Sequence, residues 1–268
     1  MFRDKTVVIT GASSGLGAVL ALKCAEGGAN LGLFALDEDG LKEVAETCEG
    51  LGARVVTATG DVGNSEDCKA VMDRTVSELG SLDHLIACAG VSMWARFEDI
   101  EDVSIFRRLM ETNYLGIVHC VYYALPHLKQ RRGSIVVISS IQGKIGVPLH
   151  TGYVASKHAV EGFCESLRME LRGSGVDVLT VLPHWLRGTN LRKNAYKSDG
   201  NTIGESKRKH SKESVSVEAC SEAILAAMKK GKRELFVPSK LKFLPWLRLI
   251  HPGIVESLVS GAMKQQNE

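Results

Sequence analysis

The sequence predicts a single α/β domain built on a doubly wound parallel sheet of seven strands, with helices on both faces. Two observations lead to this fold class. Short, continuously apolar runs alternate with helical stretches of roughly 12–20 residues. A glycine-rich turn, Thr10–Gly17, joins the first run to the first helix. Strands that are apolar on both faces belong to a parallel sheet covered on each side, and right-handed crossovers make it doubly wound.

The expected strands are runs of β-branched and aliphatic residues, and polar or glycine-containing segments separate them from the helices. The seven runs are Lys5–Thr10, Asn30–Leu36, Arg54–Ala58, Asp83–Ala89, Ser134–Ser139, Val176–Leu182 and Glu234–Val237.

The expected helices combine helical apolar spacing with terminal signals. The first ends at Gly27-Gly28, a C-cap signal, and Ser65 or Asn64 is the N-cap of the third. The helices are Gly15–Gly27, Glu38–Gly50, Ser65–Leu79, a long region from Glu101 to Arg131 in one or two pieces, Tyr153–Arg172 and Ser216–Lys230.

Two segments stand outside the alternation of strands and helices. Residues 184–212 are polar and basic, as expected for a lid over a ligand site or for a disordered loop. Residues 241–268 are apolar and basic, and they form an extension to a main domain of residues 1–240. This extension can cover the substrate cleft or a partner subunit, or lie on a membrane surface.

The composition excludes several classes of protein. The chain has 268 residues, 44% of them hydrophobic and 24% charged, as in a soluble globular protein. A net charge of +2 gives no argument for nucleic-acid binding. Seven scattered cysteines without a CxxC pair indicate reduced thiols, with neither a disulfide framework nor a metal site. No apolar window is long enough to span a bilayer, so we expect a cytoplasmic protein.

The turn between the first strand and first helix predicts a phosphate-binding loop. Glycines at 11, 15 and 17 allow the backbone to approach a pyrophosphate, and the helix N-terminus offers free N–H groups there. A tight packing turn without a ligand is the alternative.

The spacing of this loop is TGxxxGxG, and several further motifs follow it in order. They are Asp61-Val62, Ala89-Gly90, Asn113, Ser140, Tyr153-x-x-x-Lys157 and Pro183. With these motifs, residues 3 to 240 resemble the short-chain dehydrogenase/reductase family. The stretches 110–116, 138–148 and 153–159 look most like its hydroxysteroid-dehydrogenase-like branch. The resemblance implies a Rossmann-type fold and an oxidoreductase.

The resemblance assigns catalytic roles to four residues. Tyr153 is the general acid or base, and a nearby Lys157 ammonium and a cationic oxidised nicotinamide are expected to lower its pKa. Ser140 hydrogen-bonds the substrate oxygen, and Asn113 holds a water in a proton relay to Lys157. The alternatives without a catalytic role are a solvated helix face for Tyr153 and Lys157, a turn cap for Ser140 and a buried amide bonded to the backbone for Asn113.

The expected cofactor is NAD, with NADP as the alternative. Asp37 can accept from the adenine ribose and repel a 2′-phosphate, whereas Ser14 and Leu36 provide no cation for one. Asp37 can equally be a helix cap. The resemblance implies cofactor contacts by Gly11, Ser13, Ser14, Gly15, Leu16, Gly17, Leu36, Asp37, Asp61, Val62, Ala89, Gly90, Tyr153, Lys157, Pro183 and Thr189.

The substrate side is expected to be apolar, which suggests a steroid-, retinoid- or lipid-like alcohol or ketone. Besides Ser140, the residues expected there are Met93, Trp94, Phe97, His184, Trp185, Leu186 and Leu191. Two positions depart from the family pattern, since Cys88 replaces an asparagine and His184 a glycine. The basic residues of the lid are either a solvated face or an attraction for an anionic handle such as coenzyme A. They are Arg187, Arg192, Lys193, Lys197, Lys207, Arg208, Lys209 and Lys212.

The function expected from these residues is oxidoreduction of a secondary alcohol and ketone pair with NAD or NADP. The alternative is a non-catalytic protein, either a dinucleotide sensor or a peripheral membrane protein. The family resemblance also implies a homodimer or homotetramer that pairs through the helices around 101–131 and 153–172.

Overall fold

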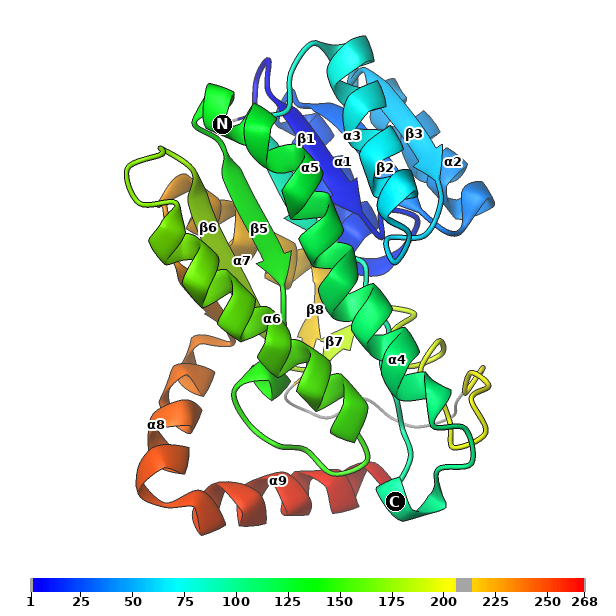
Figure 1. The fold of residues 1–268 in the computed structure, drawn as a ribbon, viewed down its shortest axis with the longest axis vertical. Coiled ribbons are helices and arrows are strands. Elements are labelled where there is room, and N and C mark those ends of the chain that lie inside the picture. The colour runs from blue at the N-terminus through cyan, green and yellow to red at the C-terminus, as the bar shows by residue number, and fades with distance from the viewer. Residues whose placement is uncertain (1, 206–213, 268) are drawn as a thin grey trace.

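The computed structural model describes residues 2–205 and 214–267, and it contains the predicted seven-stranded parallel sheet (Figure 1). Its strand order is β3-β2-β1-β4-β5-β6-β9. The strands are β1 (Thr6–Thr10), β2 (Asn30–Ala35), β3 (Val55–Thr59), β4 (His84–Ala87), β5 (Ser134–Ile138), β6 (Asp177–Pro183) and β9 (Glu234–Val237). The doubly wound fold class is therefore confirmed.

The strand order reverses direction at β1, which lies between β2 and β4. Val8 of β1 pairs with Gly32 on one side and with Leu85 on the other. The connections leaving β1 and β4 therefore diverge to opposite sides of the sheet. A ligand crevice is expected beyond the carboxyl ends of these strands.

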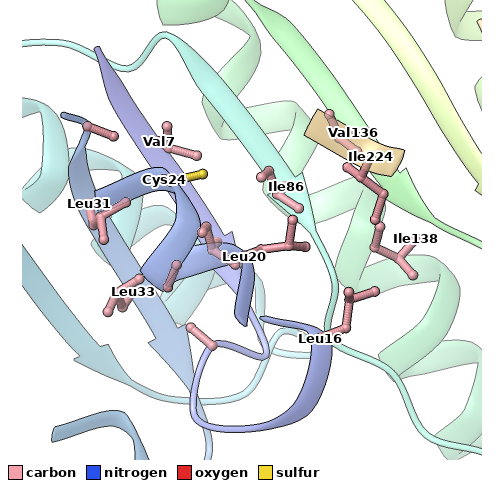
Figure 2. Close-up of a cluster of buried hydrophobic side chains, with 14 of the residues drawn as sticks. Val7, Leu16, Leu20, Cys24, Leu31, Leu33, Ile86, Val136, Ile138 and Ile224 are labelled. Atoms are coloured by element: carbon pink, nitrogen blue, oxygen red, sulfur yellow. The ribbon is translucent and has the colours of Figure 1, made fainter. Parts of the chain in front are cut away.

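One face of the sheet is covered by α1 (Gly15–Glu26), α2 (Glu38–Gly50) and α7 (Val217–Lys229). Alternate residues of β1 point to this face, so Val7 and Ile9 pack with the α1 residue Leu20. Figure 2 shows this cluster, in which α1 lies against the central strands. This apolar packing fixes the N-terminus of α1 near the carboxyl ends of the strands.

The other face carries α3 (Ser65–Leu79), α5 (Gly116–Arg131) and α6 (Thr151–Glu170). Val8 points to this side and packs with Met72 of α3 and Val160 of α6. Residues Tyr153 and Lys157 lie in the first two turns of α6, close to the carboxyl ends of the strands.

The long helical region after β4 forms in pieces, one of the two outcomes expected from sequence. It comprises α4 (Ser104–Met110), a π-helical turn η2 (Glu111–Leu115) and α5. π-helical turns widen a helix locally and are frequent at functional sites. This one holds Asn113, which is fully buried.

The predicted helix ends agree with the structure where a side chain caps them. Helices α2 and α3 have the predicted bounds, and Asn64 rather than Ser65 caps α3 by accepting from the Glu66 N–H at 3.0 Å. Ser216 caps α7 through the Ala219 N–H at 3.2 Å. Several strands are one to three residues shorter than predicted, at their first residue, their last residues or both.

Residues 184–205 of the expected lid form an ordered wall of turns. The short strand β7 (Leu186–Arg187) pairs with β8 (Val215–Ser216), and Tyr196 bridges to both Met93 and Thr202. The basic residues Lys207, Arg208, Lys209 and Lys212 lie outside the described residues.

The C-terminal extension packs on the main domain at the bottom of Figure 1. It contains η4 (Ser239–Phe243), α8 (Leu244–Ile250) and α9 (Pro252–Asn267). Leu241 and Val255 bury themselves against Ile141 and Ile145, residues of the segment after β5. No described helix is both long enough and apolar enough to cross a bilayer.

Candidate active site

A cavity of about 350 Å³ opens at the carboxyl ends of the strands, from the glycine loop to the 184–205 wall. All the residues predicted to contact the cofactor line it, from Gly11 to Thr189. So do the five predicted substrate contacts Met93, Trp94, Ser140, His184 and Trp185. The tertiary structure therefore brings the sequence motifs into one crevice, of a size typical of small-molecule sites.

The glycine loop has the geometry of a phosphate cradle. Gly11 and Gly15 have φ angles of +66° and +56°, a region that residues with a side chain rarely adopt. A methyl group on Gly17 would collide with the carbonyl oxygen of Gly11. Ser14 is the N-cap of α1 but makes no side-chain capping bond, so the first N–H groups of the helix keep their capacity for an anion.

Thr10, the last residue of β1, ties this loop to the end of β4. Its hydroxyl accepts from the N–H groups of Cys88 and Ala89, at 3.1 Å and 3.0 Å. The two strands on either side of the reversal are thus held at a fixed separation. The floor of the crevice is consequently rigid.

Asp37 serves as the cap that sequence analysis gave as its alternative role, and it also lines the cavity. Its Oδ1 accepts from the Gly40 N–H at 3.2 Å, at the N-terminus of α2. Ser14 and Leu36 line the same end of the cavity. A carboxylate in this position, with no cation supplied by Ser14 or Leu36, disfavours a 2′-phosphate on an adenine ribose.

Asp61 and Val62 line the cavity beside the end of β3. The Asp61 side chain accepts from the Gly63 N–H at 2.8 Å, and Val62 is buried against Gly116. The carboxylate is therefore oriented by its own turn, while the Val62 side chain forms an apolar surface next to it.

Tyr153, Ser140 and Lys157 meet at the other end of the crevice. Ser140 follows β5 and caps the turn η3 (Ile141–Gly143), where its Oγ accepts from the Gln142 N–H at 3.2 Å. Its hydroxyl also lies close enough to the Tyr153 phenol to favour the charged form of that group. Lys157 Nζ donates to the Ile138 carbonyl at 2.9 Å and lies 5.6 Å from the centroid of the Tyr153 ring.

Burial sets the pKa values of this cluster in the protein chain. It raises the pKa of Tyr153 to about 12, and interaction with Ser140 only partly opposes it. Burial likewise lowers the pKa of Lys157 to about 8. The lowering of the tyrosine pKa expected from Lys157 together with an oxidised nicotinamide stays a prediction.

Asn113 does not line the cavity and acts as a buried structural amide. Its Nδ2 donates to the Val91 carbonyl and to Ser156 Oγ, both at 2.9 Å, and its Oδ1 accepts from the Val91 N–H at 2.9 Å. These bonds fix the segment after β4 to α6. The water relay expected from the family resemblance stays a prediction.

The substrate end of the cavity contains a residue that sequence analysis missed. His150 is 1% exposed, lines the cavity and packs against both Trp94 and Trp185, with ring centroids 4.9 Å and 5.4 Å away. The two indole centroids are themselves 6.2 Å apart. The available signal was its place three residues before Tyr153, at the start of the same helix. A histidine alone at that position gives no pattern, and only the fold reveals its neighbours.

One expectation for the substrate side is wrong. Phe97 is 69% exposed and packs edge-on against Phe106 instead of lining the cavity. It belongs to the one-turn helix η1 (Phe97–Asp99), which turns away from the cleft. Leu186 and Leu191 do line the cavity, as predicted.

Cys88 lines the cavity in place of the family's asparagine, and burial raises the pKa of its thiol to about 12. A protonated thiol is a poor nucleophile. Within the described ranges, no three His, Cys, Asp or Glu side chains are grouped as metal ligands would be.

Comparison with known proteins gives consistent results. A family model for short chain dehydrogenases matches residues 5–200. The 11-beta-hydroxysteroid dehydrogenase A of Arachis hypogaea is 37% identical over 257 residues, which cover 94% of this chain and 73% of the relative.

Solved structures agree on the fold. A short chain dehydrogenase/reductase from Burkholderia phymatum in complex with NAD has a TM-score of 0.83 at 22% identity, covering 94% of this chain and 95% of the other. An alcohol dehydrogenase from Thermococcus sibiricus complexed with 5-hydroxy-NADP has a TM-score of 0.73 at 25% identity, covering 87% and 95%. The resemblance found in the sequence motifs is thereby confirmed, including its hydroxysteroid-dehydrogenase-like branch.

Proposed function

The chain is an oxidoreductase of the short-chain dehydrogenase family, and from this premise we propose that it interconverts a lipophilic secondary alcohol and its ketone with NAD. NADP is the alternative cofactor. One observation carries the proposal: Ser140, Tyr153 and Lys157 meet at one end of a crevice whose other end is the glycine loop.

The crevice fits a dinucleotide on the evidence of its own residues. A Cβ atom on Gly11 or Gly17 would collide with neighbouring backbone, so only glycine permits this close turn. The side chain of Ser14 leaves the first N–H groups of α1 uncapped, and these groups would hold the diphosphate. Asp37 would meet the adenosine ribose and Val62 the adenine ring. Lys157, which is 3% exposed, would bond the ribose at the nicotinamide end.

The chemistry of the side chains follows from their protonation. The bound nicotinamide supplies or accepts the hydride. At neutral pH the raised pKa of Tyr153 keeps the phenol protonated, so it is ready to donate its proton to the oxygen of a ketone. Ser140 can donate to the same oxygen and stabilise the charge that develops on it.

In the oxidative direction Tyr153 must first lose its proton. The Lys157 ammonium favours the phenolate, and a bound oxidised nicotinamide would add a second positive charge. The phenolate then takes the proton from the substrate hydroxyl. Lys157 therefore contributes most below its own pKa of about 8, where it is charged.

The names of the relatives support a hydrophobic substrate, since several are 11-beta-hydroxysteroid dehydrogenases. The cavity supports it as well, because Met93, Trp94, Trp185, Leu186 and Leu191 line the end beside Tyr153. A steroid-, retinoid- or lipid-like alcohol would bury its apolar body against these side chains.

The decisive experiment is turnover by Tyr153→Phe. We expect the wild-type protein to reduce NAD when given a lipophilic secondary alcohol, with formation of the reduced cofactor followed by absorbance. Removing the phenolic hydroxyl should lower kcat/KM by about 10²–10⁴-fold, the usual contribution of a general acid or base.

Tyr122→Phe is the matched control, because Tyr122 is 72% exposed on α5 and does not line the cavity. Full turnover by Tyr153→Phe would refute the mechanism. Cofactor binding by the wild type, without turnover of any alcohol in a broad panel, would favour a dinucleotide sensor instead.

A further inference from the structure

The buried imidazole of His150 lies inside an aromatic enclosure next to the proposed proton donor. Trp94 comes from the segment after β4 and Trp185 from the segment after β6, and both meet the imidazole edge-on. The centroid of the Tyr153 ring is 6.3 Å from that of His150. Two distant segments of the chain thus meet the start of α6 at one histidine, at the substrate end of the cavity.

The backbone before His150 is held in an unusual conformation. Leu149 has a φ of +67°, a left-handed value that is rare for a branched residue, and its carbonyl accepts from the Ala95 N–H at 3.0 Å. Although His150 occupies the N-cap of α6, its side chain makes no capping bond. Helix capping therefore does not explain this side chain, and strain of this kind is concentrated at functional sites.

The tautomer of His150 follows from its single hydrogen bond. Nδ1 lies 2.8 Å from the Pro148 carbonyl oxygen, which can only accept, so Nδ1 must carry the hydrogen. Burial lowers the pKa of the ring to about 4, and the Arg192 charge acts in the same direction. At neutral pH the ring is uncharged and Nε2 keeps a lone pair.

Among the described residues the only side-chain hydrogen bond of His150 is made by Nδ1, and Nε2 is left to face the cavity that His150 lines. The groups around the ring are two indoles, the Tyr153 phenol and the Arg192 guanidinium, which lies 6.0 Å from both indole centroids. None of them is a carboxylate. The imidazole is therefore an uncharged acceptor among aromatic side chains, with one guanidinium beyond them.

We propose that His150 selects the substrate by accepting a hydrogen bond from a second hydroxyl group near the reacting carbon. The substrate class is then a diol and its hydroxyketone. This inference rests on the proposed function. Ser140 and Tyr153 engage the reacting oxygen, while His150 engages a hydroxyl that remains a donor in both oxidation states.

A substrate without that hydroxyl would leave Nε2 unpaired in a desolvated pocket. Sites built to bond a polar group discriminate against analogues that lack it for this reason. A histidine that only packs against Trp94 and Trp185 would not discriminate between ligands of equal size. The two roles can therefore be separated by matched ligands.

The experiment measures binding to the NADH-loaded protein by calorimetry, because an alcohol cannot be oxidised in that complex. The probes are indane-1,2-diol and 2-methoxyindan-1-ol, which share a ring and both oxygens but differ in the second donor. For the wild type we expect the diol to bind roughly threefold to tenfold more tightly, the usual net value of one hydrogen bond.

Three variants dissect the effect. His150→Asn can keep the bond to Pro148 but has no acceptor at the Nε2 position, so the preference for the diol should fall toward one. His150→Gln places an amide oxygen near that position and should recover part of it. His158→Asn is the matched control, since His158 has the same Nδ1 bond to a carbonyl on the same helix, at 2.9 Å, but does not line the cavity.

Equal affinity of the wild type for both probes would overturn the proposal, and so would an unchanged preference in His150→Asn. These outcomes are independent of turnover. A protein that binds NADH and prefers the diol, but shows full activity as Tyr153→Phe, would refute the proposed mechanism while leaving the role of His150 intact.

Discussion

The two ends of the central sheet differ in how many hydrogen-bond partners they give to a buried ionisable group. At the amino end, Asp83 precedes β4 and is 1% exposed. At the carboxyl end, Lys157 is 3% exposed. Both are ionisable groups in the interior of the same domain, yet only one of them has a full set of partners.

Asp83 is saturated with hydrogen bonds. Its carboxylate accepts from the Thr6 N–H, Lys5, Ser81 and Arg131, at distances between 2.9 Å and 3.0 Å. Burial by itself would raise the pKa of this group, but the four bonds lower it to about 2. These bonds link the starts of β1 and β4 with the end of α5.

Within residues 2–205 and 214–267, Lys157 has one acceptor, the Ile138 carbonyl, and burial lowers its pKa to about 8. Ser139 Oγ and Gln142 Oε1, two polar atoms of residues that line the same cavity, are buried and find no hydrogen-bond partner among these residues. The comparison indicates that the amino end stabilises the fold, whereas the carboxyl end keeps polar groups for ligands. Crevices at the carboxyl ends of parallel strands are where such folds bind ligands.

The largest effect on this comparison is expected from Asp83→Ala. The change leaves the buried Thr6 N–H without an acceptor and removes the anchor of Lys5 and Arg131, so the free energy of unfolding should fall by about 3–5 kcal/mol. Chemical denaturation measures this value.

Cofactor affinity of the folded fraction should stay unchanged, because Asp83 does not line the cavity. Asp73→Ala is the control, since Asp73 forms an exposed pair with Lys69 on α3. If Asp83→Ala and Asp73→Ala lower the free energy of unfolding by the same amount, the hydrogen bonds of Asp83 do not stabilise the fold in the way proposed.

A smaller effect of opposite sign is expected from Lys157→Met. Replacing a desolvated ammonium by an apolar chain should raise the free energy of unfolding by about 1–2 kcal/mol at neutral pH, while oxidoreductase activity is lost. Denaturation and turnover on the same preparation measure the two quantities.

The pH dependence gives an independent check of this lysine. Its pKa is 10.5 ordinarily and about 8 in the folded protein, so between these values the unfolded chain holds a proton that the folded one lacks. Stability contributed by this group therefore rises with pH across that window. Lys157→Met should lack this rise, and an unchanged rise would show that another group produces it.

The smallest effect concerns Asp37, which combines a structural and a ligand role at the carboxyl end. Asp37→Ala should cost about 1 kcal/mol through loss of the α2 cap, whereas Asp37→Asn should keep the cap. Both changes remove a negative charge, so each should shift the NAD-to-NADP preference by about fivefold toward NADP. Kinetics with both cofactors measure this preference. If Asp37→Asn leaves it unchanged, Asp37 acts only as the cap of α2.

Local sequence signals predicted the parts of the fold that depend on neighbouring residues. Apolar runs and capping residues located the strands and most helix ends, as Asn64 and Ser216 show. The glycine loop could be predicted from the sequence, because its positive φ angles and close backbone contacts require glycine at fixed positions. Phe97 was misplaced because an aromatic residue in a loop gives no sign of the direction in which it points.

The amino-acid sequence by itself determined the doubly wound sheet and the glycine loop, since each depends on local pattern and spacing. Its resemblance to the family pointed to Ser140, Tyr153 and Lys157. Only the tertiary structure decided how these groups are solvated. Burial raises the pKa of Tyr153 and lowers that of Lys157, and folding brings Trp94, His150 and Trp185 together from three distant segments. Desolvation and such contacts depend on packing between segments far apart in the chain, which no local pattern contains.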